Sequence, residues 1–325
     1  MRRDRAPLSA GGVDLVIESH ESILRARSGA SVLPSVLILV SAVLYGVSPI
    51  LAKVAYGYGV STLTLLALRS TFATACLWLG LVASGTSIRL PGPQLAALLI
   101  TGTTLIPVQV FGYFWALVAF PASSASVLVY TFPLHVAWMG WLFLRERVRP
   151  DELGVLIVVV AGALLVAGQT PLPVGGNLQL VALAVSTLTA ALYMVVARWM
   201  VRDTQPVAAM AILAPASALT YWAVGLAAGQ IRLAMPPAAL GATLGSAALA
   251  NIAAPLLLLS ALRSVPAARA AMLGTLEPVV TVSLSVMFLG DTMTALRALG
   301  IAIVIGGIAM LQVRRSSKAA QEGRL

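Results

Sequence analysis

Residues 266–291 read PAARAAMLGTLEPVVTVSLSVMFLGD, and they align without a gap on residues 121–146, which read PASSASVLVYTFPLHVAWMGWLFLRE. Both stretches begin at a proline, have a second proline twelve residues later and end in Phe-Leu-x-acid. The same offset of 145 residues relates Lys53 to Arg198, outside these stretches. The chain therefore contains two copies of one unit, and a repeat of this length limits the folds that the chain can adopt.

The composition is that of an integral membrane protein. Hydrophobic residues make up 59% of the chain and charged residues 10%, whereas soluble domains have about 45–50% and about 25%. Apolar runs of about 20 residues, long enough to cross a bilayer as a helix, recur along the chain. We predict an all-α polytopic membrane protein with ten transmembrane helices. They span residues 34–57, 61–83, 94–117, 122–144, 152–169, 177–198, 205–228, 238–262, 267–289 and 294–313.

The net charge of +10 indicates membrane topology and not a nucleic-acid surface. The connections between the predicted helices alternate between basic and nearly uncharged, and 17 of the 21 basic residues fall in one set of connections and in the tails. An excess of Lys and Arg marks the cytoplasmic side. We predict a plasma-membrane protein with both termini in the cytoplasm. Residues 1–33 and 314–325 would be cytoplasmic tails, with residues 13–26 able to form a short interfacial helix.

Each copy contains five predicted helices, the first over residues 34–170 and the second over residues 177–313. Because five is an odd number, the second copy crosses the membrane in the opposite sense. Inverted repeats of this kind recur in secondary transporters, whose substrate site lies near mid-membrane between the copies. The sequence thus predicts two inverted five-helix repeats around a polar cavity.

The repeated unit resembles the EamA-type repeat of the drug/metabolite transporter (DMT) superfamily over residues 34–313. The residues that carry the resemblance are the two proline-to-proline stretches, their ends LRE (144–146) and LGD (289–291), and the following GVLIVVVAGALLVAG (154–168) and GIAIVIGGIAML (300–311). The family commonly has Leu-Gly-Glu at the end of the stretch, where this chain has Arg145 for the glycine and Asp291 for the glutamate.

The resemblance implies that helices one to four and six to nine surround a central cavity and that helices five and ten lie at the periphery. It also implies export or exchange of small metabolites. Helices five and ten support the peripheral position independently, because residues 153–168 and 300–311 contain no polar side chain. Such helices suit lipid contact and close packing through glycine.

Glu277 is the sharpest candidate for a functional residue. It lies about ten residues into the predicted helix over 267–289, near the bilayer centre, where an acid costs at least ~2.5–3.5 kcal/mol to insert. Pro278 follows it and frees a carbonyl about a turn earlier. Thr281 and Ser285 share its helical face. We therefore expect Glu277 to face a cavity and to bind a cationic group or carry a coupling proton; the alternative is an acid that only holds two helices together.

Other polar side chains in the predicted helices complete the candidate site. His135 is a candidate for proton relay or substrate contact, and Arg69 for contact with an anionic substrate group. A hydrogen-bonded histidine and a snorkelling or paired arginine are the commoner roles of such residues. The aromatic and amide candidates are Tyr45, Gln109, Tyr113, Tyr130, Tyr193 and Asn251. Helix packing is the competing role for each of them.

Several chemistries lack their motifs in this chain. There is no GxxxxGK[ST] for ATP, no HExxH or GxSxG, and the single cysteine, Cys76, provides neither a disulfide nor a thiolate metal site. We expect no enzyme activity, no cofactor and no metal, and we expect transport to be driven by a gradient.

The preferred function is a secondary transporter that moves a small polar or amphipathic metabolite by alternating access, outward by resemblance, with Glu277 and His135 offering a route for coupling protons. A lipid-carrier or glycolipid flippase of the same fold is the main alternative. A membrane enzyme or sensor is a third, for which the chain supplies neither a reactive cluster nor a signalling domain.

Overall fold

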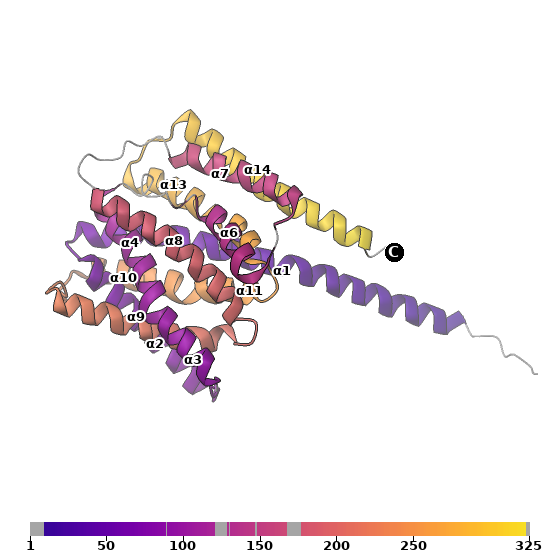
Figure 1. Cartoon of the computed structure of the whole chain (residues 1–325), viewed down its shortest axis with the longest axis horizontal. Helices are drawn as coiled ribbons and strands as arrows, with labels where there is room; N and C mark the ends of the chain where they lie inside the picture. The colour runs from indigo at the N-terminus through magenta and orange to yellow at the C-terminus, as the bar shows by residue number, and fades with distance from the viewer. Residues whose placement is uncertain are drawn as a thin grey trace, which may run out of the picture.

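The computed structural model describes residues 10–88, 90–120, 129, 131–146, 148–167 and 177–322, which form helices and contain no strand. Figure 1 shows these helices as one bundle. The elements, with π-helical segments written η, are α1 (Ala10–Gly57), α2 (Thr62–Ala83), α3 (Gly92–Ile100), η1 (Thr101–Leu105), α4 (Ile106–Ala119), α6 (Phe132–Leu144), α7 (Pro150–Ala167), α8 (Asn177–Met200), α9 (Pro206–Ala227), α10 (Pro237–Ala247), η2 (Ala248–Ala253), α11 (Ala254–Leu262), α12 (Ala267–Gly274), α13 (Leu276–Leu289) and α14 (Ala295–Glu322).

Seven helical segments in the described part of the chain are long and apolar enough to cross a membrane. They are Val32–Gly57, Thr62–Ala83, Gly92–Ala119, Asn177–Met200, Pro206–Ala227, Pro237–Leu262 and Ala267–Leu289. Three shorter apolar helices, Phe132–Leu144, Glu152–Leu165 and Ala295–Met310, fall at the other three predicted spans. The prediction of an all-α membrane protein is confirmed.

The first helix is longer than the sequence predicts. α1 begins at Ala10, although its apolar part begins only at Val32. Residues 10–33 contain no proline and many strong helix formers, so helical backbone continues through most of the segment expected to be a tail. Residues 1–9 lie outside the described residues. Figure 1 shows α1 and α14 extending from the bundle at the same end.

A π-helical segment precedes a proline in the corresponding helical segment of each copy. η1 is followed by Pro107 and η2 by Pro255. Because proline has no N–H, a backbone carbonyl about one turn earlier loses its usual donor. In the first copy the carbonyl of Gly102 instead accepts a hydrogen bond of 2.9 Å from the hydroxyl of Ser217 in α9. The irregular backbone thus finds its partner in the other repeat, as membrane interiors require.

The predicted helix over 267–289 is interrupted, which corrects the expectation of one continuous helix. α12 ends at Gly274 and α13 begins at Leu276, because Pro278 cannot donate to a carbonyl in the preceding turn. Thr275 lies between them, and its hydroxyl donates to the carbonyl of Met272 at 2.5 Å. The interruption creates a second helix start in the middle of this segment.

α4 and α8 form a close antiparallel pair between the two repeats. The hydroxyl of Ser186 donates to the carbonyl of Gln109. Three residues further along α4, a Cβ atom on Gly112 would lie only 2.6 Å from the carbonyl oxygen of Ala182. Residue numbers rise along one helix as they fall along the other, so the two helices run in opposite directions.

α1 forms the equivalent pair with the continuous helical segment made of α10, η2 and α11. The hydroxyl of Ser41 donates to the carbonyl of Ala254 at 2.8 Å, and the hydroxyls of Ser48 and Ser246 lie 2.8 Å apart. Under the repeat, α1 corresponds to α8 and α11 to α4. The same antiparallel interface therefore occurs twice, with the repeats exchanged.

α7 and α14 pack side by side at one edge of the bundle (Figure 1). A Cβ atom on Gly162 would lie 2.9 Å from the Cβ atom of Ile303, and one on Gly307 would lie 2.5 Å from the side chain of Val159. Small residues let these apolar helices approach closely, which is how helices associate in lipid.

We expect Gly112→Val to destabilise the protein, because the new side chain would overlap the backbone of α8. Overpacking a tight interface costs about 1–3 kcal/mol. The melting temperature of the purified protein in detergent should fall by several degrees. Gly80→Val is the matched control, since a Cβ atom at Gly80 would meet nothing within 4 Å. Equal melting temperatures for the two variants would contradict the close α4–α8 contact.

Candidate functional site

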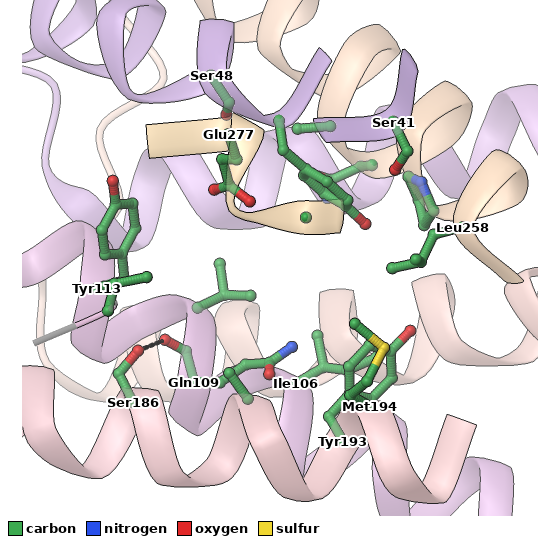
Figure 2. Close-up of a pocket in the computed structure, with 18 of the residues that line it drawn as sticks. Ser41, Ser48, Ile106, Gln109, Tyr113, Ser186, Tyr193, Met194, Leu258 and Glu277 are labelled. Carbon is green, nitrogen blue, oxygen red and sulfur yellow. Dashed lines mark hydrogen bonds between the residues drawn. The ribbon is translucent and has the colours of Figure 1, made fainter. Parts of the chain in front are cut away.

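A cavity of about 280 Å³ lies between the two repeats. Its described lining comes from α1, α2, α4, α6, α8, α9, η2, α11, α12 and α13, and none of it comes from α7 or α14. Figure 2 shows polar groups entering this space from helices on opposite sides. Among the described lining residues, Arg69 is the only basic residue and Glu277 the only acidic one.

Glu277 lies in the first turn of α13, directly after the break at Thr275. The hydroxyl of Thr281 donates to the carbonyl of Gly46 in α1 at 3.1 Å, and a Cβ atom on Gly46 would lie 2.7 Å from the backbone carbonyl oxygen of Glu277. These contacts fix the start of α13 against α1. Figure 2 shows the carboxyl group of Glu277 pointing into the space in front of α4 and α8.

The carboxyl group of Glu277 forms no hydrogen bond or ion pair with another described side chain. Its position at the start of a helix places it near the partial positive charge of that helix end. Broken helices provide ligand and ion sites in many transporters for this reason. The arrangement leaves the carboxyl group able to accept a proton or to meet a cationic group.

Arg69 is buried in α2, with 2% of its surface exposed, so it does not snorkel to the membrane surface. Its Nε and Nη2 atoms donate to Oδ1 of Asn251 in η2 at 3.2 and 2.6 Å. The guanidinium carbon lies 4.6 Å above the centre of the Phe114 ring, a cation–π geometry. The Nη1 atom is buried and has no hydrogen-bond partner.

The other predicted aromatic and amide residues gather in the same cavity. Tyr45 from α1 lines it. Gln109 and Tyr113 from α4 and Tyr193 from α8 line it as well (Figure 2). The ring of Tyr113 meets that of Phe114 edge-on, with 5.5 Å between the centroids. The Oε1 atom of Gln109 is buried without a hydrogen-bond partner. Together with Glu277, Arg69 and Asn251, seven predicted site residues meet here.

Two predicted residues are not placed in the cavity. The structure does not include His135 among the described lining residues; its Nδ1 atom lies 2.9 Å from the carbonyl oxygen of Thr131, one turn earlier in the chain. Tyr130 lies outside the described residues. The suggested proton route from Glu277 to His135 therefore has no support from the cavity.

Sequence reasoning missed Phe114 and Tyr221, which line the cavity beside the predicted residues. Phe114 faces Arg69, and Tyr221 is 3% exposed. Both are aromatic residues in apolar helices, where most such residues contact lipid or core. Phe114 differs from the other aromatic residues only in its contact with Arg69 on a neighbouring helix, and the sequence does not show that contact.

A cluster of charges joins the two repeats at one end of the cavity helices. Glu146 follows α6, and its Oε1 atom lies 3.1 Å from Nε of Arg198 in α8 and 3.7 Å from Nη2 of Arg202. Its Oε2 atom accepts a hydrogen bond of 3.0 Å from the N–H of Ala267, at the start of α12. Arg198 also donates to the carbonyl of Leu262, at the end of α11. We call these residues the Glu146 cluster.

The residues that correspond to Arg198 and Glu146 in the repeat form contacts of their own. Lys53, which corresponds to Arg198, donates from Nζ to the carbonyl of Phe120 at 2.9 Å, just after α4. Asp291, which corresponds to Glu146, lies near Lys53 so that their charges attract. The Oδ2 atom of Asp291 also accepts a hydrogen bond of 2.6 Å from Ser285. We call these residues the Asp291 cluster; its hydrogen bonds stay within the separate repeats, and only the attraction between Lys53 and Asp291 acts between them.

This arrangement can bind a small molecule that carries both polar and apolar parts. Aromatic rings offer apolar surface, while an acid, a guanidinium and two amides offer directional contacts. Within the described residues no three His, Cys, Asp or Glu side chains converge in a way that would hold a metal ion.

Comparison with known proteins yields one family. The model described as the EamA-like transporter family matches residues 33–168 and again residues 177–313. One chain of known crystal structure is 21% identical, and the match covers 85% of this chain and 96% of that chain with a TM-score of 0.72. At this identity the likeness shows a shared fold alone. No curated protein matches the sequence.

Proposed function

Because the chain belongs to the EamA-like transporter family of the DMT superfamily, we propose that it is a secondary transporter that moves a small polar or amphipathic metabolite across the plasma membrane. The observation that carries this proposal is the cavity, which is shared by both repeats and whose described lining includes one acid and one guanidinium. We propose export as the direction and a gradient as the energy source.

The proposed topology is ten spans in two inverted repeats, with both termini in the cytoplasm. Lys53 contacts the carbonyl of Phe120, so the C-terminal ends of α1 and α4 lie together and these helices run in the same direction. α8 runs antiparallel to α4 and therefore also to α1, its equivalent in the first repeat. This opposite direction of equivalent helices supports the inversion.

The proposed mechanism is alternating access, in which one repeat rocks against the other. Contacts that open and close in such a cycle must cross between the repeats. The ion pairs of the Glu146 cluster cross between the repeats, and the attraction between Lys53 and Asp291 acts between them at the opposite end of the inverted helices. We propose that each cluster closes one side of the cavity and that the two open in alternation.

Glu277 is the proposed coupling residue. It is the one carboxyl group among the described lining residues, and it has no described partner that would hold it in a single charge state. A carboxyl group in this position can take up a proton on one side of the membrane and release it on the other. We do not assign this role to His135, since it lies outside the described lining.

The test is metabolite profiling of cells that overproduce the protein, followed by flux measurements in proteoliposomes with the metabolite that changes most. We expect that metabolite to accumulate outside the cells and to cross liposome membranes only when the protein is present. Scrambling of labelled lipid without solute flux would instead identify a flippase. No change in either assay would refute the proposal.

A further inference from the structure

We propose that Arg69 and Asn251 form a docking point for a carboxylate group on the transported molecule. The inference rests on the proposed transport function and adds the chemical class of the cargo. It begins from a charge that lacks a counterion: in the described part of the chain, no carboxylate oxygen lies within 4 Å of the Arg69 side chain, which is 2% exposed. Buried charges ordinarily have a paired partner.

The contacts of Arg69 leave one nitrogen unused. Asn251 accepts hydrogen bonds from Nε and Nη2, and Phe114 lies under the guanidinium plane. Nη1 is buried without a partner, and such an unsatisfied group costs about 1–3 kcal/mol, or more when it is charged. The neighbouring cavity is the place from which an acceptor can come, because Arg69 is part of its lining.

Asn251 is a positioning residue in this arrangement. Its Oδ1 atom accepts two hydrogen bonds from Arg69, and its Nδ2 atom lies 3.4 Å from the hydroxyl of Ser70 in the same helix as Arg69. A neutral amide holds the guanidinium in place without neutralising its charge. A carboxylate at this position would have neutralised it, so the amide preserves the attraction for an incoming anion.

The charge of the cavity favours a monoanion. Arg69 is the only basic residue in its described lining, and Glu277 is the only acidic one. A phosphate dianion would bring more negative charge than one guanidinium compensates in a medium of low dielectric constant, whereas a carboxylate balances it. Glu277 remains for a proton or for a cationic group elsewhere on the same molecule.

Binding to purified protein in lipid nanodiscs tests the proposal. The probes are straight-chain and arylalkyl carboxylates from acetate to 3-phenylpropionate, each compared with its neutral amide, together with phenyl phosphate. We expect at least one carboxylate to bind the unmodified protein at least tenfold more tightly than its amide and than phenyl phosphate. No preference for any carboxylate, or a preference for the phosphate, would overturn the proposal.

Two variants show whether this preference depends on Arg69. In Arg69→Gln the ratio of carboxylate to amide affinity should fall to about one. In Asn251→Asp it should also fall at least tenfold, although the arginine is retained, because the new carboxylate pairs with it. The melting temperature reports whether each variant is folded. Arg232→Gln, an exposed arginine, is the control and should keep the preference; a folded Asn251→Asp protein that keeps it would also overturn the proposal.

The binding assay separates this proposal from the proposed transport function. Carboxylate binding that depends on Arg69, without flux of any metabolite, would leave the docking point standing and refute transport. Flux of a metabolite that has no carboxylate would leave transport standing and refute the docking point.

Discussion

Arg198→Glu is expected to reduce transport at least tenfold. The variant places two carboxylates beside each other in the Glu146 cluster, where the side chains of Arg198 and Glu146 are only 14% and 16% exposed. Breaking a largely buried ion pair costs about 3–5 kcal/mol, and every 1.4 kcal/mol changes an equilibrium about tenfold. The state in which this cluster is closed should therefore lose most of its population, and the transport cycle needs that state.

Flux in proteoliposomes measures the loss, and cysteine labelling identifies its cause. In a Cys76→Ser background, Ala190→Cys places a thiol on the cavity lining. An impermeant maleimide applied on the side of the Glu146 cluster should label it faster in Arg198→Glu than in the unmodified chain. The charge swap Glu146→Arg with Arg198→Glu should restore part of the flux. If Arg198→Glu lowers flux without faster labelling, the cluster stabilises the fold and does not act as a gate.

Glu277→Gln is expected to reduce coupled transport at least tenfold and to remove its dependence on pH. The amide keeps the shape of the side chain but cannot carry a proton. The other charged and titratable groups in the described lining of this cavity are Arg69 and the tyrosines Tyr45, Tyr113, Tyr193 and Tyr221. None of them is a second carboxyl group, so none can replace it near neutral pH. The measurement is flux against pH in proteoliposomes, with the metabolite found by profiling.

Two controls accompany this variant. Glu277→Asp keeps the carboxyl group and should retain pH-dependent flux at a lower rate. Asp203→Asn removes an exposed acid between α8 and α9 and should leave the flux and its pH profile unchanged. Glu277→Gln should also keep its melting temperature, because no described side chain bonds to the carboxyl group. An unchanged pH profile in Glu277→Gln would exclude this residue as the proton carrier.

The membrane fold was predictable because its signals are local or repeat along the chain. Apolar runs identify membrane helices wherever they occur, and the offset that pairs Pro133 with Pro278 shows the duplication directly. The break between α12 and α13 was harder to predict from the sequence. Pro278 signalled a disturbed helix, but many membrane helices continue past a proline because a neighbour takes up the freed carbonyl.

The residues of the candidate site could be predicted from the sequence, but their contacts with one another could not. Polar residues are rare in membrane helices, so Glu277, Arg69 and Asn251 stood out by type alone. That Arg69 bonds to Asn251, 182 residues away, depends on how α2 packs against η2. His135 was equally conspicuous by type but lies outside the described cavity lining.

The sequence by itself determined the class of protein, the duplication and the side chains that are too polar for lipid, since each follows from residue type and spacing. The tertiary structure alone decided which of these side chains share one cavity, and that Arg69 is held by a neutral amide with one nitrogen unpaired. It also decided that Glu146 pairs with Arg198, while Lys53 donates to the carbonyl of Phe120. Contacts between distant helices depend on the packing of the whole bundle, and no local pattern in the chain encodes them one at a time.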